Sequence, residues 1–235
     1  MRNEFIATQN VQAFNEICEE LEDIDSMIGP SMAMATGPAG RGKTEAARYY
    51  AVHSIAVYIP PFLKRTAAML LRDISFELCG ARPNRIETCL NTIRDEMGKS
   101  RRLIIVDEAD LIPMSLLEML RNINELCACP VMLIGEDRLK GKVGSETRLR
   151  DRIRRRMEFA PISASDVGVF FQRSVGVRIS SDVCNAVHHY AGGTWRRVLK
   201  LAAAAERAMF ASGLKEISHQ MAKELIGNLQ KDETK

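Results

Sequence analysis

The sequence lacks the long apolar runs and the wealth of aromatic residues that mark several classes of protein. No stretch approaches the roughly 18 uncharged apolar residues that a membrane-spanning helix requires. Residues 1–14 carry charged side chains where a signal peptide has its apolar core. Aromatic residues make up only 6% of the chain and rarely stand beside basic ones, which argues against strong binding of single-stranded nucleic acid. We therefore expect a soluble, cytoplasmic protein without membrane association.

A disulfide framework and a zinc pattern are also missing. The cysteines are scattered, mostly within apolar runs: Cys18, Cys79, Cys89, Cys127, Cys129 and Cys184. Such scattering predicts buried free thiols in a reducing compartment. Cys127 and Cys129 stand close together, but no second Cys or His pair lies at the spacing of a zinc site.

The order of apolar segments predicts an α/β domain followed by a small all-helical domain. Short apolar runs predict strands at residues 32–36, 54–59, 103–106, 131–134 and 157–159. Helical periodicity lies between them, at residues 9–28, 45–53, 63–78, 85–97, 113–126 and 146–155. This alternation predicts a parallel five-stranded sheet with helices on both faces. After Pro161 only helical periodicity remains, so we expect domains at residues 1–160 and 161–235.

A glycine-rich motif between the first predicted strand and the next helix predicts a nucleotide-binding loop. Its residues fit the pattern G-x-x-x-x-G-K-[ST]: Gly37, Pro38, Ala39, Gly40, Arg41, Gly42, Lys43 and Thr44. Glycines let backbone N–H groups wrap around phosphate oxygens, and the helix N-terminus adds partial positive charge. Lys43 would reach the β- and γ-phosphates, and the Thr44 hydroxyl would bind Mg²⁺. The motif predicts a P-loop ATPase that uses ATP and Mg²⁺.

An apolar strand that ends in two acids predicts the rest of the hydrolytic site. Residues 103–106 lead into Asp107 and Glu108. Asp107 would stand at the carboxyl edge of the sheet, beside the P-loop, and hold Mg²⁺ through water. Glu108 would polarise the attacking water as general base. Asp110 is expected to be solvated or to cap a helix.

These motifs together resemble those of the AAA+ ATPases. More narrowly, the chain resembles the phage and transposon ATPases of the Mu B transposition family. The matching segments are QNVQAFNEICEEL, GPAGRGKTEAARYYA, RLIIVDEADLIPMSLLEMLRNIN, VMLIGEDRL and RIRRRMEFAPIS, within residues 5–200. The resemblance implies an AAA+ α/β domain followed by a helical lid domain.

The resemblance also implies three further residues of the nucleotide site. Glu136 stands at the position of a polar sensor, but a γ-phosphate would repel its carboxylate, so a solvated loop acid is an equal alternative. Arg152 stands in the segment that carries the arginine finger, which reaches the active site of a neighbouring subunit. Other arginines within about a helical turn of Arg152 are alternative candidates for the finger: Arg148, Arg150, Arg154, Arg155 and Arg156. Arg196 stands at the position of the second sensor, on a helix for which Thr194 is a suitable N-cap.

Basic residues are concentrated in one segment. The formal net charge is only +3, yet residues 138–156 contain nine Lys or Arg and two Asp or Glu, a net charge of +7. Such a block is a solvated helix face, a nucleic-acid contact or a source of catalytic cations. The resemblance implies non-specific binding of duplex DNA through its phosphates. The candidate contacts are Lys64 and Arg65, with Lys140 and Lys142 in a glycine-bearing loop; solvated surface is an equal alternative for each.

Two functions therefore stay open for the predicted ATPase. The resemblance implies a protein of a bacterial host cell that assembles on duplex DNA as an ATP-dependent ring or helical filament and presents the DNA to a transposase. Only residues 1–31 precede the first predicted strand, so we expect no separate DNA-binding domain before it. The ATPase domains themselves would then bind the DNA, or a partner would supply that function. The alternative is a protein-loading or remodelling ATPase, such as a helicase-loader-like factor.

Overall fold

The computed structural model describes residues 4–23, 28–61, 66–214 and 216–233. The chain divides into two compact units. The α/β unit consists of Gln9–Pro38 and Lys43–Phe159, and the helical unit consists of Met1–Thr8, Ala39–Gly42 and Ala160–Lys235. Over the described residues, no helix combines the length and apolar character needed to cross a membrane.

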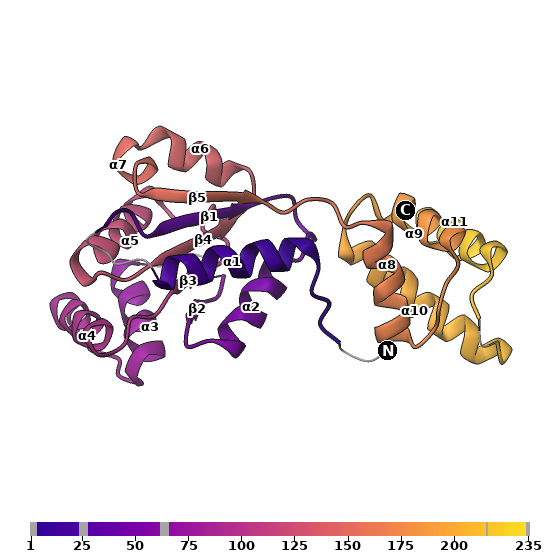
Figure 1. Ribbon diagram of the computed structural model, residues 1–235, viewed down its shortest axis with the longest axis horizontal. Coiled ribbons are helices and arrows are strands. Elements are labelled where there is room, and N and C mark those ends of the chain that lie inside the picture. Colours follow the sequence, from indigo (N-terminus) through magenta and orange to yellow (C-terminus); the bar gives the residue numbers. More distant parts are fainter. Residues whose placement is uncertain (1–3, 24–27, 62–65, 215, 234–235) are drawn as a thin grey trace. The chain divides into compact units, whose positions relative to one another are not determined.

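A parallel sheet forms the centre of the α/β unit (Figure 1). Its strands are β1 (Met32–Thr36), β2 (Val57–Ile59), β3 (Ile104–Val106), β4 (Val131–Gly135) and β5 (Ile153–Glu158). They stand in the order β2-β3-β4-β1-β5, and every neighbouring pair is parallel. All residues of β1, β3 and β4 are buried, because helices cover both faces of the sheet. The predicted five-stranded parallel sheet is confirmed.

Helices supply the rest of the core of the α/β unit. They are α1 (Gln9–Asp23), α2 (Lys43–His53), α3 (Ala67–Cys79), α4 (Ile86–Lys99), α5 (Met114–Cys127), α6 (Arg138–Ser145) and α7 (Thr147–Arg150). Helix α1 packs on β1 and β5, and α2 packs on β2 and β4. Side chains such as Leu71, Ile74 and Leu117 are fully buried in the shared core. This packing fixes the ends of the strands, where the candidate site lies.

The segment between β4 and β5 differs from its prediction. The helix predicted at residues 146–155 is wrong: α6 and the single turn α7 come first, and β5 then starts at Ile153. Lys140 and Lys142, predicted in a loop, lie on α6. The physical reason is that β5 is an edge strand whose middle positions, Arg154 to Arg156, are all exposed, so its sequence shows no apolar alternation.

The helical unit has its own core. Its helices are α8 (Ala164–Phe170), a π-helical turn (Phe171–Val175), α9 (Ser181–Ala191), α10 (Trp195–Ser212) and α11 (His219–Glu233). Ser163 and Asp166 form a capping box that starts α8. Trp195 packs against Phe170, with ring centroids 5.6 Å apart. Trp195, the only tryptophan of the sequence, therefore packs against the core of the helical unit.

Candidate active site

The carboxyl ends of β1, β3 and β4 lie next to most of the predicted residues of the nucleotide site, Arg152 excepted. Strand β4 stands between β1 and β3, so the turns after these three strands meet at one edge of the sheet. Gly37 follows β1, Asp107 and Glu108 follow β3, and Glu136 follows β4. The fold thus brings together the glycine-rich loop, two acids and Glu136, which lie far apart in the sequence.

Three glycines shape the loop between β1 and α2. Gly37, Gly40 and Gly42 have φ angles of 147°, 79° and 92°, which L side chains rarely adopt. A Cβ atom on Gly37 would lie 3.2 Å from the carbonyl oxygen of Phe159, so no larger residue fits there without a shift. Helix α2 begins at Lys43, and its first N–H groups have no helical carbonyl partner. Such a loop and helix start suit the binding of phosphate groups.

Lys43 stands among acceptors at the start of α2. Its Nζ donates to the carbonyl oxygens of Gly37 at 2.6 Å and Pro38 at 2.9 Å. Burial lowers the pKa of Lys43, while nearby carboxylates, led by Glu136 and Asp107, act in the opposite direction. Phosphate oxygens are stronger acceptors than these neutral carbonyls, so the ammonium can exchange one set of partners for the other.

Asp107 is a buried carboxylate held by two hydrogen bonds. It is 3% exposed. The Tyr58 hydroxyl on β2 donates to Asp107 Oδ2 at 2.9 Å, and the Glu108 backbone N–H donates to Oδ1 at 2.9 Å. Burial, with the adjacent Asp107 carboxylate, raises the pKa of Tyr58 well above its usual range, so the phenol keeps its proton. The Arg48 guanidinium lies 5.9 Å from the Tyr58 ring centroid.

Tyr58 and Arg48 were not predicted as site residues. Tyr58 is 49 residues from Asp107 in the sequence. Its side chain belongs to the site because β2 and β3 are paired and Tyr58 aligns with Ile105. A strand placed beside β3 with a tyrosine at its middle position is the signal that could have found it.

Glu108 is exposed and stands on a left-handed backbone. Its φ of 49° is uncommon for a residue other than glycine. Although the side chain is mostly exposed, partial desolvation raises the pKa of its carboxyl group, as do the charges of Asp107, Asp110 and Glu136, while Arg138 opposes them. A raised pKa makes a carboxylate a better proton acceptor near neutral pH. The geometry and charge of Glu108 therefore suit the role of general base.

Asp110 is not the solvated or capping residue that was predicted. It is buried, with an exposed fraction of 3%. Its Oδ2 accepts from Arg138 Nε at 2.5 Å, and its Oδ1 accepts from the Glu136 backbone N–H at 3.1 Å. Gly135 leaves room for this contact, since a Cβ there would lie 2.6 Å from Asp110 Oδ1. Asp110 therefore ties the turn after β3 to the turn after β4 and fixes Glu136.

Asp107 and Thr44 are the residues that would hold Mg²⁺. Such sites use one or two protein oxygens together with substrate phosphates, not a cage of protein ligands. Each Asp107 oxygen accepts one hydrogen bond and keeps a further lone pair. Across the described part of the chain, no three His, Cys, Asp or Glu side chains are grouped to hold a metal by themselves. This donor set fits a Mg²⁺ ion that is shared with phosphates.

The tip of the P-loop and the start of α10 are joined within the helical unit. Arg41 Nη1 donates to the Gly193 carbonyl oxygen at 2.7 Å, and the Trp195 N–H donates to the Gly40 carbonyl oxygen at 2.8 Å. A hollow of about 260 Å³ lies here, lined by Ala39, Ala191, Gly192, Thr194, Arg196, Arg197 and Lys200. Thr194 occupies the N-cap position, but its hydroxyl donates to the Ala191 carbonyl and caps no helical N–H. Arg196 thus lies beside the P-loop tip, in a hollow rich in cations.

The other predicted residues have partners within the α/β unit. Arg152 Nη2 lies 2.7 Å from Glu125 Oε1 on α5. Lys140 pairs with Asp137 and with Glu158, and Lys142 donates to the Ile112 carbonyl oxygen at 2.8 Å. Lys64 and Arg65 lie outside the described residues.

The chain is similar in sequence to known proteins. Residues 27–143 match the family model of an AAA domain. The chain is 31% identical over 146 residues to the "ATP-dependent target DNA activator B" of Escherichia phage Mu, covering 58% of this chain and 47% of that protein. It is 30% identical over 125 residues to the "Mu-like prophage FluMu DNA transposition protein B" of Haemophilus influenzae, covering 50% of this chain and 44% of that protein. The chain therefore spans about half the length of the curated relatives it matches.

Solved structures share the fold at lower sequence identity. The Aeropyrum pernix ORC2 protein has a TM-score of 0.70 and 15% identity, covering 97% of this chain and 69% of that one. The Thermotoga maritima RuvB Holliday junction branch migration motor has a TM-score of 0.63 and 18% identity, covering 96% of this chain and 70% of that one. At these identities the similarities show a shared fold.

Proposed function

We propose that this chain, an AAA+ ATPase, binds duplex DNA without sequence preference when ATP is bound and regulates DNA transposition through its assembly on that DNA. The observation that carries the proposal is the similarity to the target DNA activator B of phage Mu, together with the P-loop and its paired acids. A transposase and further copies of this chain would be its protein partners. The DNA contacts would be made to phosphates, because target DNA of arbitrary sequence has to be accepted.

The nucleotide chemistry is assigned to residues around the ends of β1, β3 and β4. The loop N–H groups and the Lys43 ammonium bind phosphate oxygens, and Thr44 and Asp107 hold Mg²⁺. When bound, a Mg²⁺ ion would supply positive charge beside the phosphate oxygens. Glu108 takes the proton of the attacking water, and its raised pKa suits that task. Asp110 and Arg138 keep Glu136 in place at the turn after β4.

Two arginines are assigned further roles, one at a subunit interface and one in nucleotide sensing. Arg152 is proposed as the arginine finger, which acts on the site of a neighbouring subunit once its pair with Glu125 is broken. Arg196 is proposed as the second sensor, since it lies near the P-loop tip in the helical unit.

Fluorescence anisotropy of a labelled random-sequence duplex tests the proposal. The protein is titrated with ADP, with a non-hydrolysable ATP analogue or without nucleotide, each at two salt concentrations. Binding that requires the ATP analogue, rises steeply with protein concentration and weakens with salt supports a nucleotide-gated assembly on DNA. If no nucleotide produces DNA binding, the transposition role is wrong.

A protein-loading or remodelling ATPase is the second candidate. Sparse aromatic residues among the basic ones argue against a grip on single strands, which leaves a protein client as the other target of an AAA+ machine. Stimulation of hydrolysis separates the two candidates. Duplex DNA accelerates ATP turnover in the first, whereas only a protein partner does so in the second.

A further inference from the structure

Strand β5 turns a run of arginines into a basic edge of the sheet. It is the last strand in the order and pairs with β1 alone. Arg154, Arg155 and Arg156 are all exposed. Adjacent positive charges oppose the addition of a further strand along this edge, so a second sheet is an unfavourable partner. A polyanion, in contrast, is attracted by the same charges.

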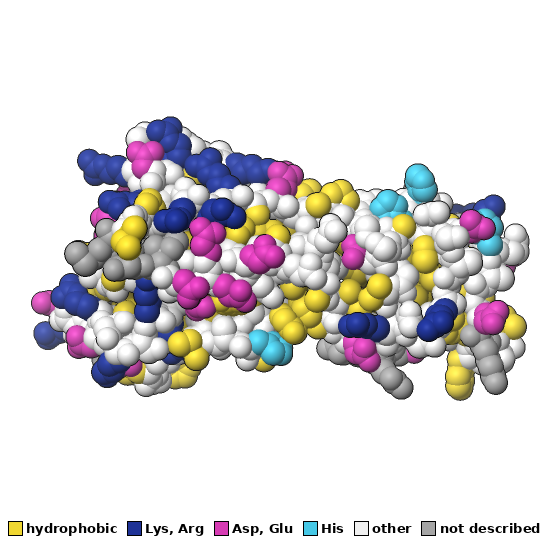
Figure 2. All heavy atoms as spheres, in the orientation of Figure 1, with side chains coloured by type: hydrophobic (Ala, Val, Ile, Leu, Met, Phe, Trp, Pro, Cys, Tyr) yellow, Lys and Arg dark blue, Asp and Glu magenta, His cyan; other side chains and the backbone are white. Residues whose placement is uncertain are grey.

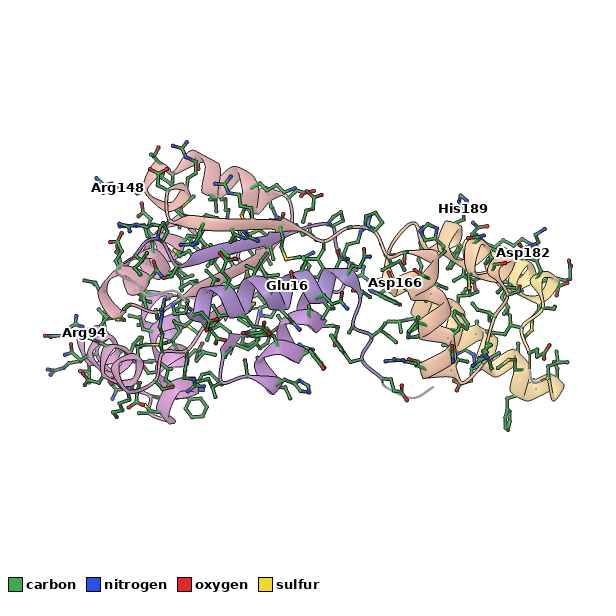
Figure 3. The ribbon with its side chains drawn as sticks, in the orientation of Figure 1. Glu16, Arg94, Arg148, Asp166, Asp182 and His189 are labelled. Atoms are coloured by element: carbon green, nitrogen blue, oxygen red, sulfur yellow. The ribbon has the colours of Figure 1, made fainter. Side chains whose placement is uncertain are left out.

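Helices α6 and α7 extend this basic surface. Figure 2 shows Lys and Arg side chains gathered along the part of the α/β unit formed by α6, α7 and β5. In Figure 3, Arg148 extends outward from α7. We define the basic edge as Lys140, Arg148, Arg150, Arg154, Arg155 and Arg156. Two exposed glycines, Gly141 and Gly144, lie on α6, and a Cβ atom at either would meet nothing within 4 Å.

The ion pairs within the basic edge leave a surplus of positive charge. Arg154 and Arg155 share the single carboxylate of Glu20, each at 3.4 Å. Arg150 has only the adjacent Asp151, at 3.5 Å. For Arg148 and Arg156, no acidic partner lies within ion-pair distance among the described residues. The arginines with the least compensation are therefore the ones most available to an external anion.

The two exposed glycines of α6 also favour a ligand on this surface. Each glycine in a helix interior costs about 1 kcal/mol relative to alanine. Gly141 and Gly144 do not stand on a left-handed backbone, and nothing packs against them. The fold of α6 does not require them, but a bare helix surface lets a bulky ligand approach the backbone closely.

We infer that the basic edge is the surface that grips the sugar–phosphate backbone of duplex DNA, with Arg148 and Arg156 as its main contacts. This inference rests on the proposed DNA-binding function and assigns that function to a face of the α/β unit. The contacts are charge contacts to phosphates, so they carry no base preference. Lys140 contributes less, because Asp137 and Glu158 already neutralise it.

Neutralising the two free arginines tests the assignment. In the double variant Arg148→Gln with Arg156→Gln, the loss of two phosphate contacts lowers the slope of log K against log salt by about 1.8. Affinity at about 0.15 M salt falls roughly 10- to 30-fold. The probe is the labelled random-sequence duplex in the presence of the non-hydrolysable ATP analogue. Binding of a fluorescent ATP analogue to each variant shows that the nucleotide site is intact.

A matched control removes the same charge elsewhere. Arg178→Gln with Lys223→Gln changes two exposed cations of the helical unit and is expected to keep the parent slope. Arg148→Lys with Arg156→Lys keeps both charges and is expected to bind within about threefold of the parent, since phosphates need only a point charge. If the Gln variant binds like the control, the basic edge is not the DNA surface, although DNA binding stands. If the parent itself does not bind, the DNA-binding function fails and this surface with it.

Discussion

Asp107 illustrates how a single side chain of the site depends on a residue of another strand. Tyr58→Phe removes the hydroxyl that donates to Asp107 Oδ2 and leaves the ring in place. A hydrogen bond to a charged group contributes about 1.5–3 kcal/mol, so the half-saturating Mg²⁺ concentration is expected to rise roughly 10- to 150-fold. Titration of Mg²⁺ against binding of a fluorescent ATP analogue measures this.

Tyr49→Phe is the matched control for that experiment. Tyr49 stands on α2, where its ring packs on His53 with centroids 4.1 Å apart. The substitution Tyr49→Phe also removes a phenol hydroxyl, but away from Asp107, and is expected to leave the Mg²⁺ titration unchanged. Equal Mg²⁺ dependence of Tyr58→Phe and the parent would show that the hydroxyl does not orient the metal ligand.

Glu108 gives a prediction for the dependence of hydrolysis on pH. Its pKa is raised above the usual 4.5, so the base becomes protonated and turnover falls as the pH drops through that raised pKa. The acidic limb of log kcat is therefore expected above pH 4.5. Glu108→Gln is expected to bind ATP like the parent and hydrolyse it at least about 100-fold more slowly, since general base catalysis contributes that much. A parent-like rate in this variant would mean that another group is the base.

The turn between β4 and α6 gives a prediction at the level of secondary structure elements. Gly135→Ala places a Cβ atom 2.6 Å from Asp110 Oδ1 and 3.1 Å from the Asp110 backbone N. Overpacking of this kind costs about 1–3 kcal/mol, so urea unfolding is expected to show a loss of that size. Turnover should fall too, because Asp110 positions the turn that carries Glu136.

Gly144→Ala is the control within the same segment. Its Cβ atom meets nothing within 4 Å, and α6 continues through it. Alanine favours the helix, so a gain of about 0.5–1 kcal/mol is expected. If both alanine variants lost stability equally, contact with Asp110 would not be the cause.

The sequence predicts elements best where burial imposes a pattern. Strands β1, β3 and β4 read as apolar runs because both faces are covered, and the P-loop reads directly because its chemistry requires glycines and a lysine. A fifth strand was predicted only from residue 157, and the first residues of β5 were assigned to a helix. The reason is that β5 is a sheet edge whose exposed arginines show no alternation, while Ile153 and Met157 stand four residues apart, as on a helix. The bonds from Tyr58 to Asp107 and from Arg138 to Asp110 join residues 49 and 28 positions apart, so only the order of the strands reveals them.

At the scale of the whole molecule, substitution of Arg152 tests whether subunits act on one another. The Arg152 guanidinium pairs with Glu125 within its own unit. Arg152→Ala is expected to lower turnover by about 10³-fold or more, since an arginine finger in trans has that effect. Affinity of the isolated subunit for ATP should not change, because the finger acts on a neighbouring site. A fluorescent ATP analogue and a phosphate-release assay measure the two quantities separately.

Mixing two inactive variants distinguishes action across an interface from action within one chain. Lys43→Ala is expected to abolish ATP binding, because it removes the ammonium at the P-loop, but it keeps Arg152. When it is mixed with Arg152→Ala protein, an intact nucleotide site of one subunit can meet an intact finger of the other, and turnover should return. A mixture of Lys43→Ala with Glu108→Gln is the control, since no subunit then has both the lysine and the base, and it should stay inactive. If neither mixture regains activity while Arg152→Ala alone remains slow, Arg152 acts within its own subunit, where its pair with Glu125 already holds it.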